Sequence, residues 1–528
     1  MNELIETDVL IIGCGIGGGT AALKLAQAGV KVTLITRSHE PANTNTAWAQ
    51  GGIIYRGHDD SPQLLAEDID RAGAYFTNPS AVRVLSEEGP LLVHDILIDQ
   101  LKVPFDHHGD ALSVALEGGH SLPRIVHAAD ATGAAIEKSL LNALAREPNV
   151  TLLTGHTAID LITPDHHAKN RLTLYDPISC VGAYVLDRES GHVKRVLTKR
   201  TVLATGGLGQ IFLYTTNPNG SRGDGLAMAY RAGARVINCE FVQFHPTTFM
   251  KQGAPRFLIT EAVRGDGGRL VHADGTPFMD KYDAVWKDLA PRDLVSRSIY
   301  FEMLEHGVPN VYLDLKSYIT PERIREHFPN IYAQCLKYGV DMTQELVPIA
   351  PAAHYSCGGV WVDEVGRTTI TDLYAVGEVS CTGLHGANRL ASTSLLEGLV
   401  WGKRAADDIV GQLASSGPLA SSGLHDADDI PPWDEDEAGI PDPALISQDM
   451  STIQSLMWNY VGLVRNKPRL DRALSELRHL ETEIERFYRE SKVTDELLGL
   501  RNAVRSAVII AQAAWSNKQS IGCHYRES

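Results

Sequence analysis

The chain has few cysteines, a deficit of positive charge and no long hydrophobic run. Its 528 residues include seven scattered cysteines, an odd number, and no pair of them has metal-ligand spacing. We expect buried free thiols in a reducing compartment and no bound metal. Lysine and arginine total 48 against 65 acidic residues, for a net charge of -17. This balance argues against a general binder of nucleic acid or anionic membranes, but it allows a small basic pocket.

We expect neither a membrane-spanning nor a secretory segment in this sequence. No window approaches the roughly 20 apolar residues of a transmembrane helix. Glu3, Glu6 and Asp8 lie where a signal peptide would be basic. We therefore expect a cytoplasmic protein without membrane contact, and the length predicts more than one domain.

A glycine-rich turn near the N-terminus organises the first part of the chain. The apolar run of residues 9–12 ends at Gly13, Gly15 and Gly18, which have the G-x-G-x-x-G spacing, and a helical pattern follows. A second strand is expected over 30–36, which completes a βαβ unit. In such a unit the glycines allow a tight turn and close approach of a pyrophosphate to the helix N-terminus.

The end of the expected second strand departs from the usual dinucleotide fingerprint. Thr36 and Arg37 stand where an acidic residue would bind a ribose hydroxyl. An NADP site with its 2′-phosphate on Arg37 is one alternative, and a flavin site is the other. Asp224, near the start of a further helix, is either a helix cap or a ligand contact.

The rest of the sequence predicts further domains. Strands are expected over 150–154, 172–175, 181–186 and 201–205, and a helix over 134–145. The change of character near 239 predicts an inserted domain over 239–353, so the first domain comprises 1–238 and 354–413. Residues 414–445, rich in Ser, Gly, Pro and Asp, predict a linker. Apolar residues at three- and four-residue steps after 446 predict a three-helix bundle over 446–528.

Several motifs together resemble the succinate dehydrogenase and fumarate reductase flavoprotein superfamily, over nearly the whole chain. They are the G-x-G-x-x-G turn, the segments 49–52 and 204–207, Gly377-Glu378, and the set His245, Arg292, His354 and Arg389. The segments 117–121, 244–247, 260–265 and 384–389 resemble most the branch that oxidises L-aspartate. The resemblance implies an α/β fold: a Rossmann-like FAD-binding domain, an inserted α+β capping domain and a C-terminal three-helix bundle.

The resemblance also implies how the cofactor is bound. Asn45 appears at the position where membrane-bound relatives carry a histidine linked to the flavin, so FAD is expected to bind non-covalently. The helix that opens at Ser394 would present its positive end to the flavin. The residues expected to hold FAD are Gly13, Gly15, Gly18, Arg37, Thr44, Ala49, Gln50, Gly51, Gly52, Asp224, Glu378, Ser394 and Leu395.

The substrate that the resemblance implies is a four-carbon dicarboxylate. Arg389, His354, His245 and Thr260 are expected to hold its carboxylates, since arginine binds a carboxylate with two hydrogen bonds. Arg292 is expected at the reacting carbons, first as an electrostatic group. In fumarate reduction Arg292 would be the proton donor, resupplied through Glu261 and Arg264. Glu117 would attract the ammonium group of L-aspartate and repel succinate; without the resemblance, a surface acid is the simpler interpretation.

The implied reaction is oxidation of L-aspartate to iminoaspartate, the first step of NAD biosynthesis, with delivery to quinolinate synthase. Oxygen, giving hydrogen peroxide, or fumarate, giving succinate, would reoxidise the flavin. A soluble fumarate reductase or succinate dehydrogenase flavoprotein subunit shares nearly every motif and is the second hypothesis. A flavin-binding module that serves RNA modification or acts as a scaffold is the third, and the acidic balance of the chain counts against nucleic-acid binding.

Overall fold

The computed structural model describes residues 3–415, 424–434 and 439–527. A seven-stranded sheet forms the centre of what we call the main unit, with strand order β8-β2-β1-β11-β10-β9 and β18 paired to β11. The pairs β8/β2, β2/β1, β1/β11 and β11/β18 are parallel, whereas β10 runs antiparallel to both of its neighbours. The strands are β1 (Leu4–Ile12), β2 (Val32–Thr36), β8 (Val150–Thr154), β9 (His156–Ile162), β10 (Gly182–Asp187), β11 (Val193–Leu203) and β18 (Leu373–Ala375).

Helices of the main unit cover this sheet. The helix α1 packs against α12, and both bury small residues at their contact, where Gly402 lies against the backbone of Gly17. A short π-helix, Val93–Gln100, continues α4. The helices are α1 (Ile16–Gln27), α2 (Asn45–Trp48), α3 (Pro62–Ala72), α4 (Pro79–Leu92), α5 (Thr132–Leu144), α6 (Pro164–His167), α7 (Asp224–Arg231) and α12 (Thr393–Ser415).

Short strands complete the main unit. They form the sheets β3-β7-β6 and β12-β17-β19 and the pair β4-β5. Their bounds are β3 (Ile53–Ile54), β4 (His107–His108), β5 (Ala111–Leu112), β6 (Val114–Ala115), β7 (Ile125–Val126), β12 (Val236–Ile237), β17 (Gly359–Trp361) and β19 (Ser380–Cys381).

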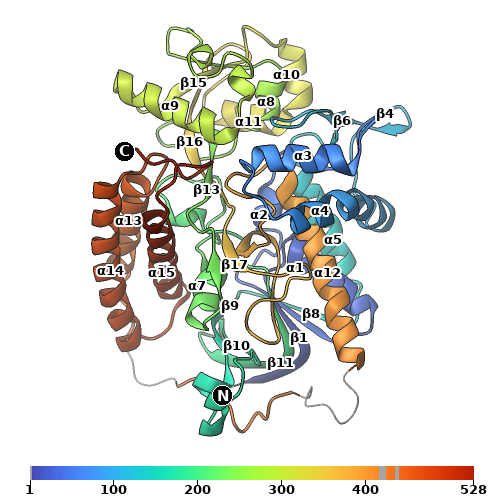
Figure 1. Cartoon of the computed structure of the whole chain (residues 1–528), viewed down its shortest axis with the longest axis vertical. Coiled ribbons are helices and arrows are strands. Elements are labelled where there is room, and N and C mark those ends of the chain that lie inside the picture. Colours follow the sequence, from blue (N-terminus) through green and yellow to red (C-terminus); the bar gives the residue numbers. More distant parts are fainter. Residues whose placement is uncertain (1–2, 416–423, 435–438, 528) are drawn as a thin grey trace.

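A second unit, the capping unit, lies at one end of the main unit (Figure 1). Its antiparallel sheet has the order β13-β16-β15-β14 and packs with four helices around a separate apolar core. Its elements are β13 (Val242–Phe249), α8 (Ala262–Gly265), β14 (Arg269–Val271), α9 (Arg292–His306), β15 (Val311–Asp314), α10 (Pro321–His327), α11 (Pro329–Lys337) and β16 (Val347–Ser356).

Three long helices, which we call the helical tail, pack on one side of the main unit (Figure 1). They are α13 (Pro443–Tyr460), α14 (Lys467–Glu490) and α15 (Asp495–Ser516). Their apolar residues share one core with the sheet of the main unit, and α15 packs against α7. The mixed α/β fold with a three-helix C-terminal region is therefore as predicted, although part of the predicted linker lies outside the described residues.

Three local predictions need correction. The strand predicted over 201–205 is the end of β11, which begins at Val193 and ends at Leu203. The strand predicted at 172–175 is wrong: Arg171–Tyr175 form a 3-10 helix that Asn170 caps, and Leu172, Leu174 and Tyr175 are exposed. Apolar residues in a surface loop produced a false strand pattern. The second strand starts two residues later than predicted, at Val32, because the chain turns at Gly29 with a positive φ of 82°.

All seven cysteines are buried and free. In the described part of the chain, no helix is both long and apolar enough to cross a membrane.

Candidate functional site

A large cavity extends from the carboxyl ends of the main sheet to the capping unit, and all but two of the predicted site residues line it. Its walls come from the turn after β1, the loop around α2, the start of α12, and β13, α9 and β16 of the capping unit. Gly18 and Arg264 are the two predicted residues that do not line the cavity. Ligands of α/β sheets collect at such a strand edge, so the location is chemically reasonable.

The glycine turn packs closely on neighbouring backbone only because Gly13 and Gly18 lack side chains. Gly13 has a φ of 110°, and a Cβ there would lie 2.2 Å from the carbonyl oxygen of Ala204. A Cβ at Gly18 would lie 2.0 Å from the carbonyl oxygen of Gly13, so Gly18 serves helix–strand packing. Gly15 is the N-cap of α1 and provides no side-chain cap. The N-terminus of α1 therefore faces the cavity, as a pyrophosphate site requires.

Glu378 lines the same cavity and is held by two donors. The Asn45 side-chain amide donates to Glu378 Oε2 at 2.8 Å, and the Ser356 backbone N–H donates to Oε1 at 3.1 Å. Burial raises the pKa of Glu378 to about 7 in spite of these hydrogen bonds. Asn45 also accepts a hydrogen bond from Ser221 Oγ at 2.7 Å, so its amide is fixed at both ends.

The helical tail contacts two residues that line the cavity, which the sequence did not indicate. Arg37 forms an ion pair, at 2.7 Å, with Asp495, which is the first residue of α15. Asp224 accepts a hydrogen bond from the Asn502 side chain at 2.8 Å and pairs with Arg222 at 3.0 Å. Two predicted cofactor residues are thus positioned by residues more than 250 positions away in the chain, which periodicity and local motifs cannot reveal.

Arg389 provides a buried cation at the end of the cavity near the capping unit. Its guanidinium lies 4.6 Å over the Tyr355 ring and donates to Ser394 Oγ at 2.8 Å and to Gln243 Oε1 at 3.2 Å. Burial, assisted by the positive charge of Arg292, lowers the pKa of Arg389 to about 10. The group stays cationic near neutral pH, and an anion would stabilise that buried charge.

Arg292, the first residue of α9, lies next to Glu261. Its Nε donates to Glu261 Oε2 at 2.6 Å, and Arg264 lies 3.7 Å from the same oxygen on the far side. Burial raises the pKa of Glu261, but the charges of Arg292 and Arg264 outweigh this effect and bring the pKa to about 2. Glu261 is therefore an anion between two cations, and Arg264, fully buried, lies behind the cavity wall.

Two histidines, the buried His245 and the half-buried His354, face each other in the same region. The rings of His245 and His354 have centroids 5.1 Å apart at an angle of 65°. Burial lowers the pKa of both imidazoles well below the usual value, and the charges of Arg292 and Arg389 add to this effect. The Thr247 N–H donates to His245 Nδ1 at 3.2 Å, which leaves the proton of the neutral ring on Nε2. This Nε2 has no partner within the described residues, so it is available to an acceptor in the cavity.

Glu117 supplies an acid to a region otherwise rich in cations. It is only 7% exposed, and Ser392 Oγ donates to its Oε2 at 2.6 Å. Burial raises the pKa of Glu117 against the effect of this hydrogen bond. A Cβ on Gly51 would lie 3.0 Å from Glu117 Oε1, so the carboxylate packs on the glycine loop. The buried carboxylate is poised to bind a cationic group of a ligand.

Sequence reasoning missed two residues of this region. Gln243 Oε1 accepts hydrogen bonds from both Arg292, at 3.3 Å, and Arg389, at 3.2 Å, and so sets the spacing of the two guanidinium groups. Ser392, with a positive φ of 56°, positions Glu117. A non-glycine residue in the left-handed region often marks a functional site, but backbone angles are not readable from a sequence.

Thr260, a predicted site residue, is buried, lines the cavity and precedes α8.

Comparisons with known proteins match this architecture. A family model described as "FAD binding domain" matches residues 8–395, and one described as "Fumarate reductase flavoprotein C-term" matches residues 450–528. L-aspartate oxidase 1 of Ralstonia nicotianae is 45% identical, covering 98% of this chain and 94% of its own length. The L-aspartate oxidase of Pseudomonas aeruginosa is 42% identical over 99% of this chain and 96% of its own. A chloroplastic L-aspartate oxidase of Nicotiana tabacum is 41% identical over 98% and 80%.

Solved structures give the same picture of the fold. E. coli quinol fumarate reductase superposes with a TM-score of 0.88 at 26% identity, covering 100% of this chain and 92% of that one. The Sdh1 complex of Mycobacterium smegmatis superposes with a TM-score of 0.79 at 28% identity, covering 99% and 89%.

Proposed function

The chain belongs to the L-aspartate oxidase family of FAD-dependent oxidoreductases, and we propose that it oxidises L-aspartate to iminoaspartate. The observation that carries the proposal is the buried carboxylate of Glu117 in a cavity that Arg292 and Arg389 also line, while the nearby carboxylate of Glu261 is already paired with Arg292. Two carboxylates and one ammonium describe aspartate, whereas succinate and fumarate lack the ammonium. Electrostatic complementarity of this kind sets specificity among similar ligands.

The residues around the glycine turn fit FAD. The tight turn at Gly13, the N-terminus of α1 at the cavity and the glycine loop that ends at Gly52 suit a pyrophosphate and a flat ring. When bound, FAD supplies the acceptor for the hydride that leaves the substrate Cα. The N-terminus of α12, with Ser394 and Leu395 in its first turn, presents its positive end to the cavity and favours negative charge there.

Four side chains are proposed to hold the substrate carboxylates. Arg389 would bind one carboxylate through its planar guanidinium, in exchange for its present partners. His245 Nε2–H, His354 and the Thr260 hydroxyl would donate hydrogen bonds. Because both imidazoles are neutral near pH 7, they donate without adding charge. Burial keeps water away from these contacts and strengthens them.

Arg292 is proposed to act at the reacting carbons. Glu261 fixes its guanidinium through the contact at 2.6 Å, and Arg264 lies 3.7 Å from the same carboxylate oxygen. The role in aspartate oxidation is electrostatic, because arginine holds its proton tightly. In fumarate reduction, Arg292 is the proposed proton donor, and Glu261 and Arg264 are proposed to resupply its proton. Glu261 contacts both guanidinium groups.

Further features of the proposal concern the cofactor and the cell. FAD is held non-covalently, since the amide of Asn45 offers no nucleophile and is already bonded to Glu378 and Ser221. Oxygen or fumarate accepts the electrons, giving hydrogen peroxide or succinate. Iminoaspartate passes to quinolinate synthase in NAD biosynthesis, in the cytoplasm.

Product analysis of the purified holoenzyme tests the proposal. With L-aspartate and oxygen we expect hydrogen peroxide, and with L-aspartate and fumarate under nitrogen we expect succinate in equal amount to the aspartate consumed. Turnover of succinate with an artificial acceptor, and none of L-aspartate, would instead identify a fumarate reductase or succinate dehydrogenase flavoprotein subunit. Denaturation in acid should release the flavin from the polypeptide; flavin that stays attached would contradict non-covalent binding.

A further inference from the structure

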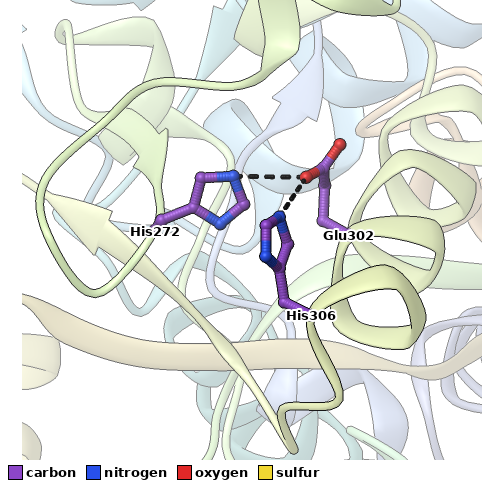
Figure 2. A group of neighbouring side chains, drawn as sticks. All are labelled: His272, Glu302 and His306. Atoms are coloured by element: carbon purple, nitrogen blue, oxygen red, sulfur yellow. Dashed lines mark ion pairs between the residues drawn. The ribbon is translucent and has the colours of Figure 1, made fainter.

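We propose that the capping unit contains a binding site for a divalent transition metal of the zinc class, formed by His272, Glu302 and His306 (Figure 2). None of these residues lines the large cavity, and none belongs to the predicted active site. The inference is independent of the proposed reaction and departs from the expectation, drawn from the cysteines, that the chain binds no metal.

The chain brings the three side chains together from two elements. Glu302 and His306 are four residues apart and share one face of the last turns of α9. His272 directly follows β14, and its backbone N–H donates to the Thr276 carbonyl at 3.0 Å, which closes a turn. Gly307, with a φ of 62°, ends α9 directly after His306. The backbone on both sides is therefore fixed by regular hydrogen bonding.

The distances among the ligand atoms are those of a tetrahedral metal site. The Nε2 atoms of His272 and His306 lie 3.2 and 3.4 Å from Glu302 Oε2, and the three candidate ligand atoms all lie within 4.8 Å of one another. Zinc bonds of about 2.0–2.1 Å at the tetrahedral angle place neighbouring ligands about 3.3 Å apart. The imidazole rings have centroids 4.5 Å apart at 64°, so both nitrogens converge without stacking of the rings.

The second carboxylate oxygen is held separately, which orients the first toward the histidines. Glu302 Oε1 accepts hydrogen bonds from Tyr282 OH at 2.6 Å and from Lys281 Nζ at 2.7 Å. Outer contacts of this kind orient metal-binding carboxylates. The positive charge of Lys281 would repel a metal ion bound beside Glu302. The Lys281 side chain is 52% exposed, however, and has a second partner, Glu305, at 3.0 Å. It can therefore turn toward Glu305 when a metal binds.

The donor set determines which ions the site would take. Two imidazole nitrogens and one carboxylate oxygen suit Zn²⁺, Co²⁺ or Ni²⁺, whereas Mg²⁺ and Ca²⁺ prefer sites made of oxygen alone. The Glu302 side chain is 2% exposed, but those of His272 and His306 are 23% and 49% exposed. The ion would thus rest on a buried carboxylate with solvent on the outer side, where a water molecule completes the tetrahedron.

Metal binding would tie the end of α9 to β14 within the capping unit. Arg292 lies at the opposite end of α9, in the cavity, so the ion would stabilise the unit that carries Arg292 without touching the substrate. A ligand that binds only the folded state raises the free energy of unfolding by RT ln(1 + c/Kd), where c is the free ligand concentration, and the melting temperature rises with it. We expect zinc to raise the melting temperature of the holoenzyme.

Calorimetric titration of chelator-treated holoenzyme with ZnCl2 tests the site, together with the metal content after dialysis. We expect one zinc per chain, and at least about tenfold weaker binding in His306→Ala and His272→Ala, which each remove one ligand. MgCl2 should not compete. His306 is half exposed, so His306→Ala is expected to keep its FAD and its flavin reduction by aspartate, which confirms an intact fold.

A matched control comes from the second histidine–acid cluster in the described residues. His94, Asp95 and Asp99 are all exposed, and His94→Ala should bind zinc like the wild type. The proposal is overturned if the wild type takes up no zinc, since the cluster is then a hydrogen-bonded ion cluster alone. It is equally overturned if His306→Ala and His272→Ala bind zinc with unchanged stoichiometry and affinity.

Discussion

Replacing Glu117 by glutamine removes one negative charge from the cavity and keeps the size of the side chain. In the wild type this carboxylate is buried beside Ser392 and the glycine loop, with no cation on it among the described contacts except the more distant Arg292. The ammonium of L-aspartate would provide the missing counter-charge. Glutamine can still accept a hydrogen bond from Ser392, so the change isolates the charge from the shape.

The expected loss follows from the strength of a buried, charge-assisted hydrogen bond. Such a bond contributes about 1.5–3 kcal/mol, and about 1.4 kcal/mol corresponds to a factor of ten. We therefore expect kcat/KM for L-aspartate to fall about ten- to a hundredfold in Glu117→Gln. Fumarate carries no ammonium, so its reduction should be unchanged or improved, because a repulsive charge has been removed.

Steady-state kinetics of the same enzyme preparation with the two substrates measure this difference. The ratio of kcat/KM for L-aspartate to that for fumarate is the quantity to compare, since errors in active-enzyme concentration cancel. Ser392→Ala serves as a control that keeps the charge and removes only its positioning partner, and should lower the ratio less. Equal losses for both substrates in Glu117→Gln would refute recognition of the ammonium by this residue.

Three further predictions concern the surroundings of the cavity. Asp130 in the main unit accepts hydrogen bonds from the backbone N–H groups of Asn330 and Ile331, at 3.0 and 2.9 Å, at the start of α11 in the capping unit. Asp130→Ala should raise KM for aspartate about fivefold, because it loosens this contact between the two units. Asp68 accepts the N–H of Ser121 at 2.8 Å and so braces the loop that begins at Glu117; Asp68→Asn should lower the aspartate-to-fumarate ratio several-fold. Burial raises the pKa of Glu137 from 4.5 to about 8. The contribution of neutral Glu137 to the free energy of unfolding is complete below pH 4.5 and is lost as the pH rises through 8. Glu137→Gln should therefore raise the melting temperature at pH 9 but not at pH 5.

Controls separate these effects from general damage. A drop in kcat of Asp130→Ala at saturating substrate, without a change in KM, would contradict a role in holding the capping unit. Asp68→Asn must keep its FAD, and equal losses with both substrates would show that the loop has no part in selectivity. A constant difference in melting temperature between Glu137→Gln and the wild type from pH 5 to 9 would mean that Glu137 does not ionise in this range.

Local sequence patterns predicted the elements that are stabilised locally. The turn at Gly13 and Gly15 was predictable because the backbone itself excludes side chains there, and the apolar stripe of the 446–528 region predicted α14. The segment 172–175 shows the limit of this reasoning. Its alternation of apolar and polar residues resembles a strand, but it pairs with no strand among the described residues, and pairing is a tertiary property.

The cavity residues that escaped prediction depend on contacts between distant parts of the chain. Asp495 and Asn502 belong to a helix that appears, from its sequence, to serve packing alone, and they reach Arg37 and Asp224 only in the folded chain. The position of Arg264 behind the cavity wall was equally hidden. The family resemblance brought the correct motifs together, and the contacts of their side chains came from the structure.

The central claim, a cavity that selects a dicarboxylate with an ammonium group, is tested most directly by anaerobic titration of the holoenzyme. The flavin absorbance should bleach upon addition of about one equivalent of L-aspartate and remain unchanged with the same amount of succinate. Bleaching by succinate, with L-aspartate inert, would contradict the account.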